Sequence, residues 1–170
     1  MPVKTQSQSS VLRSREVARA FDQLIAETED EPFEVAESKY RALQRRLLRS
    51  HVKTAFERQE LRRRIAERVF TEAFTSECPW SVFKRTLRRI RRLGYSNVER
   101  RYHVAVLYAL WCARHPEHDR REALRLLDET ERALVRLPRS NTLRKALWEA
   151  LTQKRRETGL LPALPAQAPD

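Results

Sequence analysis

Only two glycines, Gly94 and Gly159, occur among the 170 residues of this chain. A phosphate-binding P-loop needs two glycines and a lysine in one short loop, a dinucleotide fingerprint needs three glycines, and a nucleophile elbow needs two around a serine. None of these motifs is possible here. Tight two-residue hairpins also rely on glycine, which disfavours an all-β fold. The sequence therefore predicts an all-helical protein and excludes the glycine-dependent nucleotide-binding and hydrolase classes.

Apolar residues recur at helical spacing through the first half of the chain. This spacing predicts a first helix over Leu12–Glu27, a second from Phe33, and a fourth over Pro79–Gly94. No glycine or proline separates the second helix from the third, so one long helix is an open alternative. We favour a break at Ser50–Thr54, because Thr54-Ala-Phe-Glu57 has the sequence of a capping box. The stripe expected to be buried on the fourth helix consists of Trp80, Phe83, Leu87 and Ile90.

The second half contains a segment, Tyr102–Ala113, that is apolar nearly all round a helix. A second capping box, Ser96-Asn-Val-Glu99, opens this helix and Pro116 stops it. A helix that is apolar on every side belongs in a protein interior. We expect its core residues Val104, Leu107, Ala109 and Leu110 to be mostly buried. A sixth helix is expected after an Asp119 cap, ending at Pro138, and a seventh from Ser140-Asn141 to just before Gly159.

The predicted fold class is all-α, a single compact multi-helix bundle of six to seven antiparallel helices with a central apolar helix near residues 98–114. The helical domain is expected over residues 11–158. A disordered lead at residues 1–10 is expected to precede it. A proline-rich tail at residues 159–170 is expected to follow.

The sequence also bears on the compartment. The polar first ten residues lack the apolar core of a signal peptide, and two cysteines are too few for a disulfide framework. The longest apolar run, Val104–Ala113, would span about 15 Å as a helix, half the hydrocarbon thickness of a bilayer. We therefore expect a cytoplasmic protein without a membrane span.

The net charge of +12 is unevenly distributed. Residues 21–38 carry seven acidic side chains and no Lys or Arg, residues 39–68 carry eleven basic and three acidic ones, and residues 84–101 carry eight basic and one acidic. Basic segments attract nucleic acid, anionic lipid or an acidic protein face. Two plainer interpretations stay open. The basic residues are a solvated surface in an arginine-rich composition, or the acidic segment folds against a basic one and cancels part of its field.

The candidate binding site is the basic face of the fourth helix together with the start of the fifth. Guanidinium groups bind carboxylates and phosphates through paired hydrogen bonds, so spaced arginines on one helix suit either ligand. Asn and Gln are scarce in this segment, which disfavours base-specific reading of nucleic acid. The expected partner-binding residues are Lys84, Arg85, Arg88, Arg89, Arg91, Arg92, Arg100 and Arg101.

We interpret the chain as a non-enzymatic adaptor or assembly subunit that docks an acidic protein partner and needs no cofactor. The alternative is a DNA- or RNA-binding protein that contacts the phosphate backbone through the same arginines. A smaller contribution is expected from Arg45, Arg46 and Arg49, because Glu57 and Glu60 dilute the field around them.

One further cluster contains metal-ligating residue types. Cys112, His115 and His118 have three-residue spacing, and a thiolate with two imidazoles can bind zinc. A fourth ligand is missing nearby and the spacing matches no standard zinc module. We therefore expect no metal site, with Cys112 a buried small residue and the two histidines capping a helix end. No serine or cysteine nucleophile has an identifiable His and acid partner, so no catalytic residue is assigned.

One further segment combines several motifs in a fixed order along the chain. It contains Leu93-Gly94, a predicted helix, a His115-Pro116-Glu117 loop and a second predicted helix with Ala133-Leu134 and Leu137. Over Leu93–Leu137 the chain resembles a J-domain, the helical module that stimulates heat-shock chaperones. The resemblance implies a degenerate J-domain-like co-chaperone. The loop has Glu117 where that family has aspartate, and the helix before the loop is apolar where the family's is basic.

Overall fold

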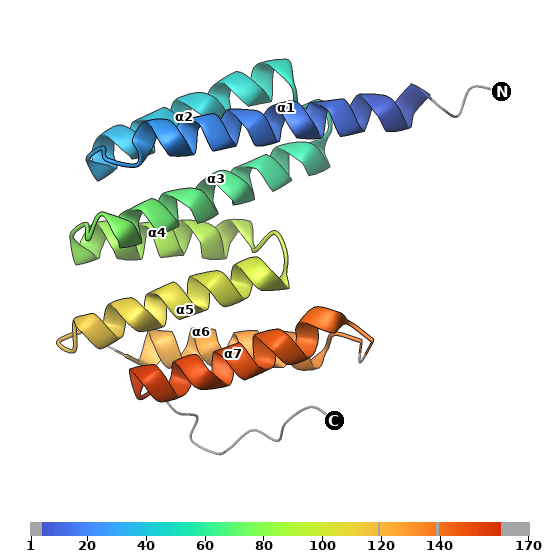
Figure 1. Ribbon diagram of the computed structural model, residues 1–170. Coiled ribbons are helices and arrows are strands. Elements are labelled where there is room, and N and C mark those ends of the chain that lie inside the picture. The colour runs from blue at the N-terminus through green and yellow to red at the C-terminus, as the bar shows by residue number, and fades with distance from the viewer. Residues whose placement is uncertain (1–4, 119, 139, 161–170) are drawn as a thin grey trace. The chain divides into compact units, whose positions relative to one another are not determined.

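The computed structural model describes residues 5–118, 120–138 and 140–160. Within these residues the secondary structure consists of seven α-helices and contains no strand, which confirms the all-α fold class (Figure 1). The contacts between helices divide the chain into two compact units, residues 1–94 (unit 1) and 95–170 (unit 2). Each unit is therefore described by itself. The single domain over residues 11–158 stays a prediction.

Unit 1 contains four helices, and each packs against the next: α1 (Thr5–Thr28), α2 (Phe33–Ser50), α3 (Ala55–Thr75) and α4 (Trp80–Leu93). The first helix begins seven residues before the expected Leu12, because no glycine or proline between Thr5 and Thr28 interrupts it. Residues 5–10 of the expected disordered lead are thus helical, and the rest of the lead lies outside the described residues. None of the helices, within the described parts of the chain, is long and apolar enough to cross a bilayer.

The break between α2 and α3 is where the capping box predicts it. The Thr54 hydroxyl accepts a hydrogen bond from the Glu57 backbone N–H at 3.1 Å, and the Glu57 carboxylate accepts one from the Thr54 N–H at 3.0 Å. These bonds satisfy backbone donors that a new helix leaves unpaired. One continuous helix over both segments is therefore wrong.

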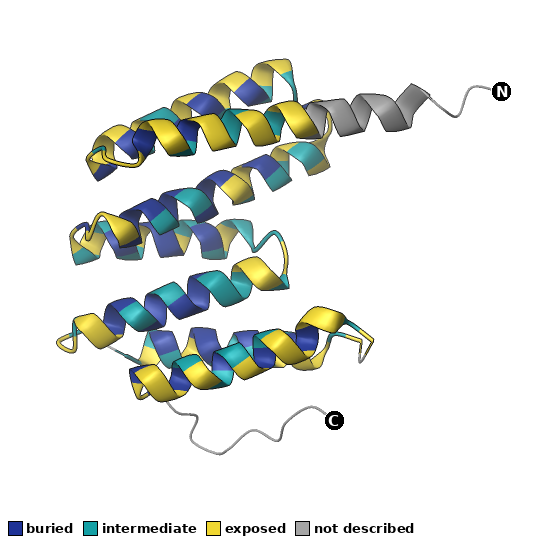
Figure 2. Cartoon of the chain, viewed as in Figure 1, coloured by how far each residue is buried: buried dark blue, intermediate teal, exposed yellow. Residues whose placement is uncertain are grey.

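The core of unit 1 is formed by one apolar stripe on each helix (Figure 2). The buried residues of α4 include Phe83, Leu87 and Ile90, and those of α2 are Phe33, Ala36, Tyr40, Leu43 and Leu47. The rings of Phe70 and Phe83 stack with centroids 4.8 Å apart, which joins α3 to α4. Trp80 is only half-buried, contrary to expectation, because it begins α4 at the edge of this core.

A polar network lies inside unit 1 around Tyr40, whose side chain is fully buried. Its hydroxyl lies 3.3 Å from the Thr28 hydroxyl of α1 and donates to the Glu72 carboxylate of α3 at 3.3 Å. Arg68 donates to the same hydroxyl at 3.0 Å and forms an ion pair with Glu72. One tyrosine thus joins three helices, and its buried oxygen is satisfied.

Unit 2 consists of α5 (Val98–Arg114), α6 (Arg121–Val135) and α7 (Thr142–Thr158), and all three pack against one another. Val104 and Ala109 are buried as expected, whereas Leu107 and Leu110 are half-buried. Those two residues lie on a side of α5 that neither α6 nor α7 closes completely. The central apolar helix near residues 98–114 is confirmed, but its burial is less complete than the sequence predicts.

The helix caps of unit 2 differ partly from the predicted ones. Asn97, not Ser96, caps α5: its side-chain oxygen accepts from the Arg100 N–H at 2.9 Å. Asn97 has an extended backbone and directly precedes the first helical residue, which is the N-cap position. Ser96 lies one residue before that position. Asn141 caps α7 as predicted, with a bond from the Leu143 N–H at 3.0 Å. The predicted Asp119 cap lies outside the described residues, as does the tail from residue 161.

A buried arginine holds α7 against α6. Arg155 is 3 % exposed, and its Nη2 donates to Asp128 at 2.6 Å and to Glu131 at 3.0 Å, both on α6. Its Nη1 donates to the Leu160 carbonyl at 3.3 Å, just after the α7 cap at Gly159. The two carboxylates and the Leu160 carbonyl offset the desolvation penalty of burying this guanidinium.

Candidate basic surface

The basic face of α4 follows from its burial pattern. Phe83, Leu87 and Ile90 fix the inward side of the helix. Residues three, four and seven positions apart share one face, so Arg85, Arg88 and Arg92 lie together on the opposite side and are exposed. The predicted outward direction of these three side chains is confirmed.

The other predicted cations of α4 lie on its two flanks. The ammonium of Lys84 lies over the Trp80 ring, 5.7 Å from its centroid, and the half-buried Arg91 lies two turns further along the same flank. Arg89 is half-buried on the flank toward α2 and was expected to point outward. Its Nη2 donates to the Gln44 side-chain oxygen of α2 at 3.5 Å. The predicted cations of α4 therefore occupy three different environments: the exposed face, the flank with Trp80 and the flank toward α2.

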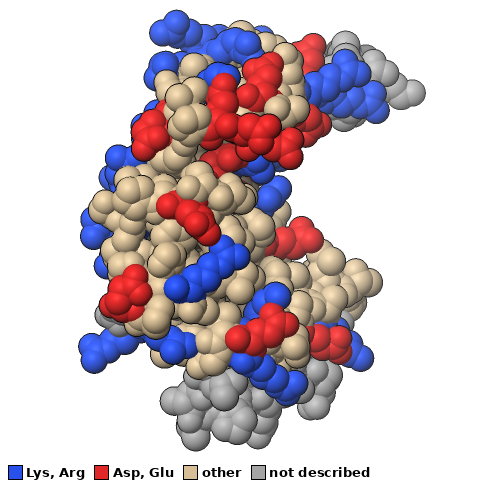
Figure 3. Space-filling view, turned by 60° about the vertical axis from the view of Figure 1, so that its left-hand side comes forward, with Lys and Arg blue, Asp and Glu red and all other residues tan. Residues whose placement is uncertain are grey.

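A carboxylate of α2 links the two helices. One Glu37 oxygen accepts from Arg85 of α4 at 2.9 Å, and the other accepts from Arg41 Nη2 and Nε at 2.5 and 3.2 Å. The Glu37 side chain is only 12 % exposed, whereas that of Arg85 is 58 % exposed. Glu37 belongs to the acidic segment, so part of that segment does fold against basic residues. Figure 3 shows how acidic side chains gather over unit 1 on the face drawn there, with basic ones along its edges.

The charge of Arg89 is compensated only in part. Burial lowers the pKa of its guanidinium, and the positive charges of Arg41 and Arg92 lower it further, while Glu37 alone opposes them. Its ordinary pKa is so high that the group stays charged at neutral pH. Among the described residues it forms no ion pair. We call Arg41, Arg85, Arg88, Arg89 and Arg92, with Glu37 and Gln44, the α2–α4 basic surface.

Arg100 and Arg101 belong to unit 2. Arg100 is exposed in the first turn of α5. Arg101 is half-buried, with its guanidinium 4.8 Å from the centroid of the Tyr95 ring and Nη1 donating to the Glu129 carbonyl at 3.4 Å. Their membership of the site on α4 stays a prediction.

The residues considered for zinc do not assemble into a site. Cys112 is fully buried within α5, and the ring of His115 packs on Trp111 with centroids 4.7 Å apart. The His115 and His118 rings are 6.0 Å apart and both face the Glu117 carboxylate, at 3.6 and 3.4 Å. In the described ranges of the chain, no group of three His, Cys, Asp or Glu side chains is placed to hold a metal ion. The J-domain resemblance of this loop stays a prediction.

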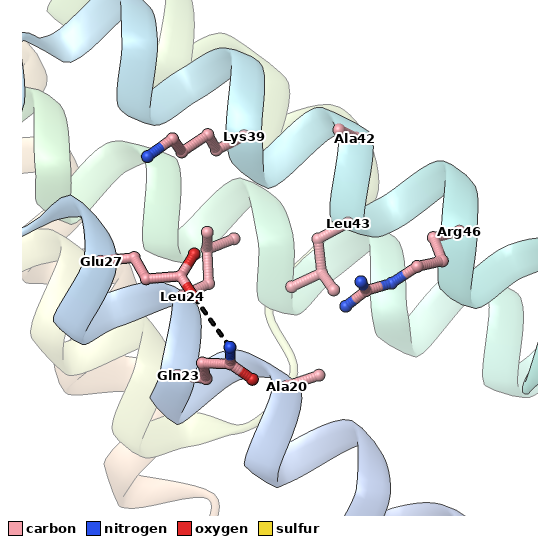
Figure 4. Close-up of a pocket in the computed structure, with 8 residues that line it drawn as sticks. All are labelled: Ala20, Gln23, Leu24, Glu27, Lys39, Ala42, Leu43 and Arg46. Carbon is pink, nitrogen blue, oxygen red and sulfur yellow. Dashed lines mark hydrogen bonds between the residues drawn. The ribbon is translucent and has the colours of Figure 1, made fainter.

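A separate pocket of about 300 Å³ lies between α1 and α2 (Figure 4). Its apolar lining consists of Ala20, Leu24, Ala42 and Leu43, and its polar lining of Gln23, Glu27, Lys39 and Arg46. Gln23 donates to Glu27 at 2.8 Å along α1. Arg46, from which a smaller contribution to binding is expected, lines this pocket, and none of the eight expected partner-binding residues does.

Sequence reasoning missed Glu37, Arg41 and Gln44. The three residues share one face of α2, since they lie at positions i, i+4 and i+7. This spacing is visible in the sequence, but only the packing of α2 and α4 against α3 shows that the face borders α4. Comparisons with protein-family models, curated proteins and solved structures find no match for this chain.

Proposed function

We propose that the chain is a non-enzymatic binding module whose α2–α4 basic surface docks an acidic protein face. The observation that carries this proposal is the state of Arg88 and Arg92. Both are exposed, and among the described residues neither forms an ion pair. They share α4 with Arg85 and Arg89, and Glu37 is already engaged by Arg41 and Arg85, so the two exposed guanidinium groups keep an unpaired positive charge. Such a surface attracts and orients anionic groups.

The size of the surface favours a protein partner over nucleic acid. Arg85 to Arg92 span roughly 10 Å along α4, whereas a backbone-tracking site meets a phosphate about every 3.4 Å along each strand over a long path. Trp80, the nearest aromatic of α4, lies on the flank with Lys84 rather than among the exposed arginines.

The test compares the binding of two negatively charged probes. Fluorescein-labelled octaglutamate stands for an acidic protein face, and labelled oligothymidylate for a phosphate backbone. We expect salt-sensitive binding of octaglutamate, weakened about tenfold in R88E/R92E, because each reversed cation both loses an attraction and adds a repulsion. Arg85 is left in place because its reversal would set two carboxylates against each other at Glu37.

The matched control is R45E/R49E, which changes the net charge equally on exposed positions of α2. We expect it to weaken octaglutamate binding less than R88E/R92E does. Equal losses would place the binding site elsewhere, and no loss in either variant would make the charge a solvated surface. Tighter binding of oligothymidylate that R88E/R92E abolishes would favour the nucleic-acid alternative.

A further inference from the structure

Resting on the proposed function, we infer that Arg89 is the anchor of the α2–α4 basic surface and receives one carboxylate side chain of the acidic partner. Glu37 shows what such a contact looks like. It accepts from Arg85 of α4 and from Arg41 of α2, one on each of its oxygens. Arg89 lies one turn after Arg85 on α4, and the α2 residue that it contacts is Gln44, two turns after Glu37.

The amide of Gln44 replaces the charge that would complete a second pair. Its oxygen accepts from Arg89 at 3.5 Å, the outer limit of a hydrogen bond, and brings no negative charge. Arg89 therefore keeps a half-buried charge next to Arg41 and Arg92, which Glu37 compensates only in part. A carboxylate from outside would relieve the repulsion among three guanidinium groups at once.

Recognition of a carboxylate fits the donors at this position. The Arg89 guanidinium offers a planar fork of N–H groups, and a fork bonds both oxygens of a carboxylate. With its oxygen turned to Arg89, Gln44 presents its amide N–H groups as additional donors. Partial burial strengthens the attraction relative to a fully exposed arginine such as Arg88. The partner group is thus a Glu or Asp side chain that projects from a protein surface.

The first test separates the contribution of the forked N–H groups of Arg89 from the contribution of its positive charge. R89K keeps the charge and removes the fork, and R89Q removes both; R88K and R88Q are the matched pair on the exposed face. With octaglutamate as the probe, we expect R89K and R89Q each to weaken binding about fivefold or more. R88K should bind within about twofold of wild type, since an exposed cation acts through charge alone.

The second test adds the missing internal carboxylate. Q44E should pair with Arg89, raise the melting temperature and weaken octaglutamate binding about fivefold, because the anchor is then occupied. The control A146E, on an exposed position of α7, changes the net charge equally and should do neither. Far-ultraviolet circular dichroism confirms that each variant remains folded.

The outcomes distinguish the two proposals. If wild-type protein fails to bind octaglutamate, or R88E/R92E binds it as well as wild type does, both the proposed function and the anchor are wrong. If R88E/R92E weakens binding but R89K binds like wild type, or R89Q loses no more than R88Q, only the anchor is wrong. A Q44E variant that keeps full binding also overturns the anchor.

Discussion

The Nε of Arg63 on α3 donates a hydrogen bond to the carbonyl oxygen of Leu93, the last residue of α4, at 2.8 Å. Gln59, one turn earlier on α3, donates to the same oxygen at 3.1 Å. The last carbonyls of a helix have no partner within the helix, so these side chains satisfy one of them. The helix that carries the basic surface is thereby fixed at its C-terminal end by its neighbour.

Substitution of Arg63 by Met should destabilise the protein by about 1.5–3 kcal/mol, the range for a hydrogen bond that involves a charged group. Methionine keeps much of the aliphatic volume and removes the donor, together with a longer pairing of Arg63 with Glu60 at 3.9 Å. Chemical denaturation followed by circular dichroism measures the change. The control R64M removes an exposed arginine that pairs with Glu60 on its own helix, and it should cost less. Equal costs would show that the Leu93 cap contributes nothing.

The two glycines should differ in their tolerance of substitution. Gly94 has φ +78° and ψ 172°, a region almost confined to glycine, whereas Gly159 has φ +65° and ψ 18°, the left-handed region that asparagine also visits. We expect G94N to destabilise the protein by about 1–3 kcal/mol and G159N by only a few tenths of a kcal/mol. A Cβ at position 94 also meets Arg63 Nη2 at 3.5 Å, an ordinary contact, so backbone conformation is the cause. Thermal melting of the two variants decides; equal melting temperatures would contradict this account.

Replacement of Arg155 by Met should destabilise the protein by about 2–3 kcal/mol, because it leaves Glu131 facing the interior without its cation. The value is below the usual cost of a broken buried pair, since Asp128 is 45 % exposed and water compensates it. Adding E131Q to R155M should recover part of the loss. A double variant that is no more stable than R155M alone would show that the Glu131 charge is not the reason. Urea denaturation of the four proteins of this cycle gives the measurement.

The thiol of Cys78 should be unreactive at neutral pH. Burial raises its pKa from 9.0 to about 11, with a further increase from Glu34 and an opposing effect of Arg85. Thiolate is the nucleophile, so alkylation by iodoacetamide should be far slower in folded than in denatured protein. Peptide mapping distinguishes Cys78 from Cys112. Rapid labelling of Cys78 in folded protein would disprove its burial.

The same shift makes a prediction about alkaline pH. Below about pH 9 the thiol is protonated in both states and adds no pH dependence. Between about pH 9 and 11 the unfolded chain loses the proton first, so this contribution to stability falls as pH rises. The unfolding free energy should therefore fall less steeply with rising pH in C78A than in wild type over that window. Parallel slopes would contradict the prediction.

The sequence predicts local features of this fold well and long-range ones poorly. The Thr54–Glu57 box and the apolar stripe of α4 were readable because every residue involved lies within a few positions of the others. Arg155 gave no such signal: as one more arginine in a polar helix, it is buried only because Asp128 and Glu131 approach from α6.

For the candidate surface, the outward direction of Arg85, Arg88 and Arg92 followed from helical periodicity. The difference between Arg88 and Arg89 did not, because it depends on whether α2 lies alongside. Glu37 is 48 residues from Arg85 in the sequence, and the opposite charges of their two segments indicated attraction without specifying the pair.

The two units also have a consequence for how the chain forms its structure during synthesis. In unit 1 each helix packs on its neighbour in sequence, and the last residue of that unit is Gly94. Contacts between sequence neighbours give a low contact order, which goes with rapid folding. Domains made first on the ribosome fold first. We therefore expect the α2–α4 basic surface, complete at Arg92, to assemble while α5 to α7 are still being translated, so that the proposed acidic partner can meet it on the nascent chain.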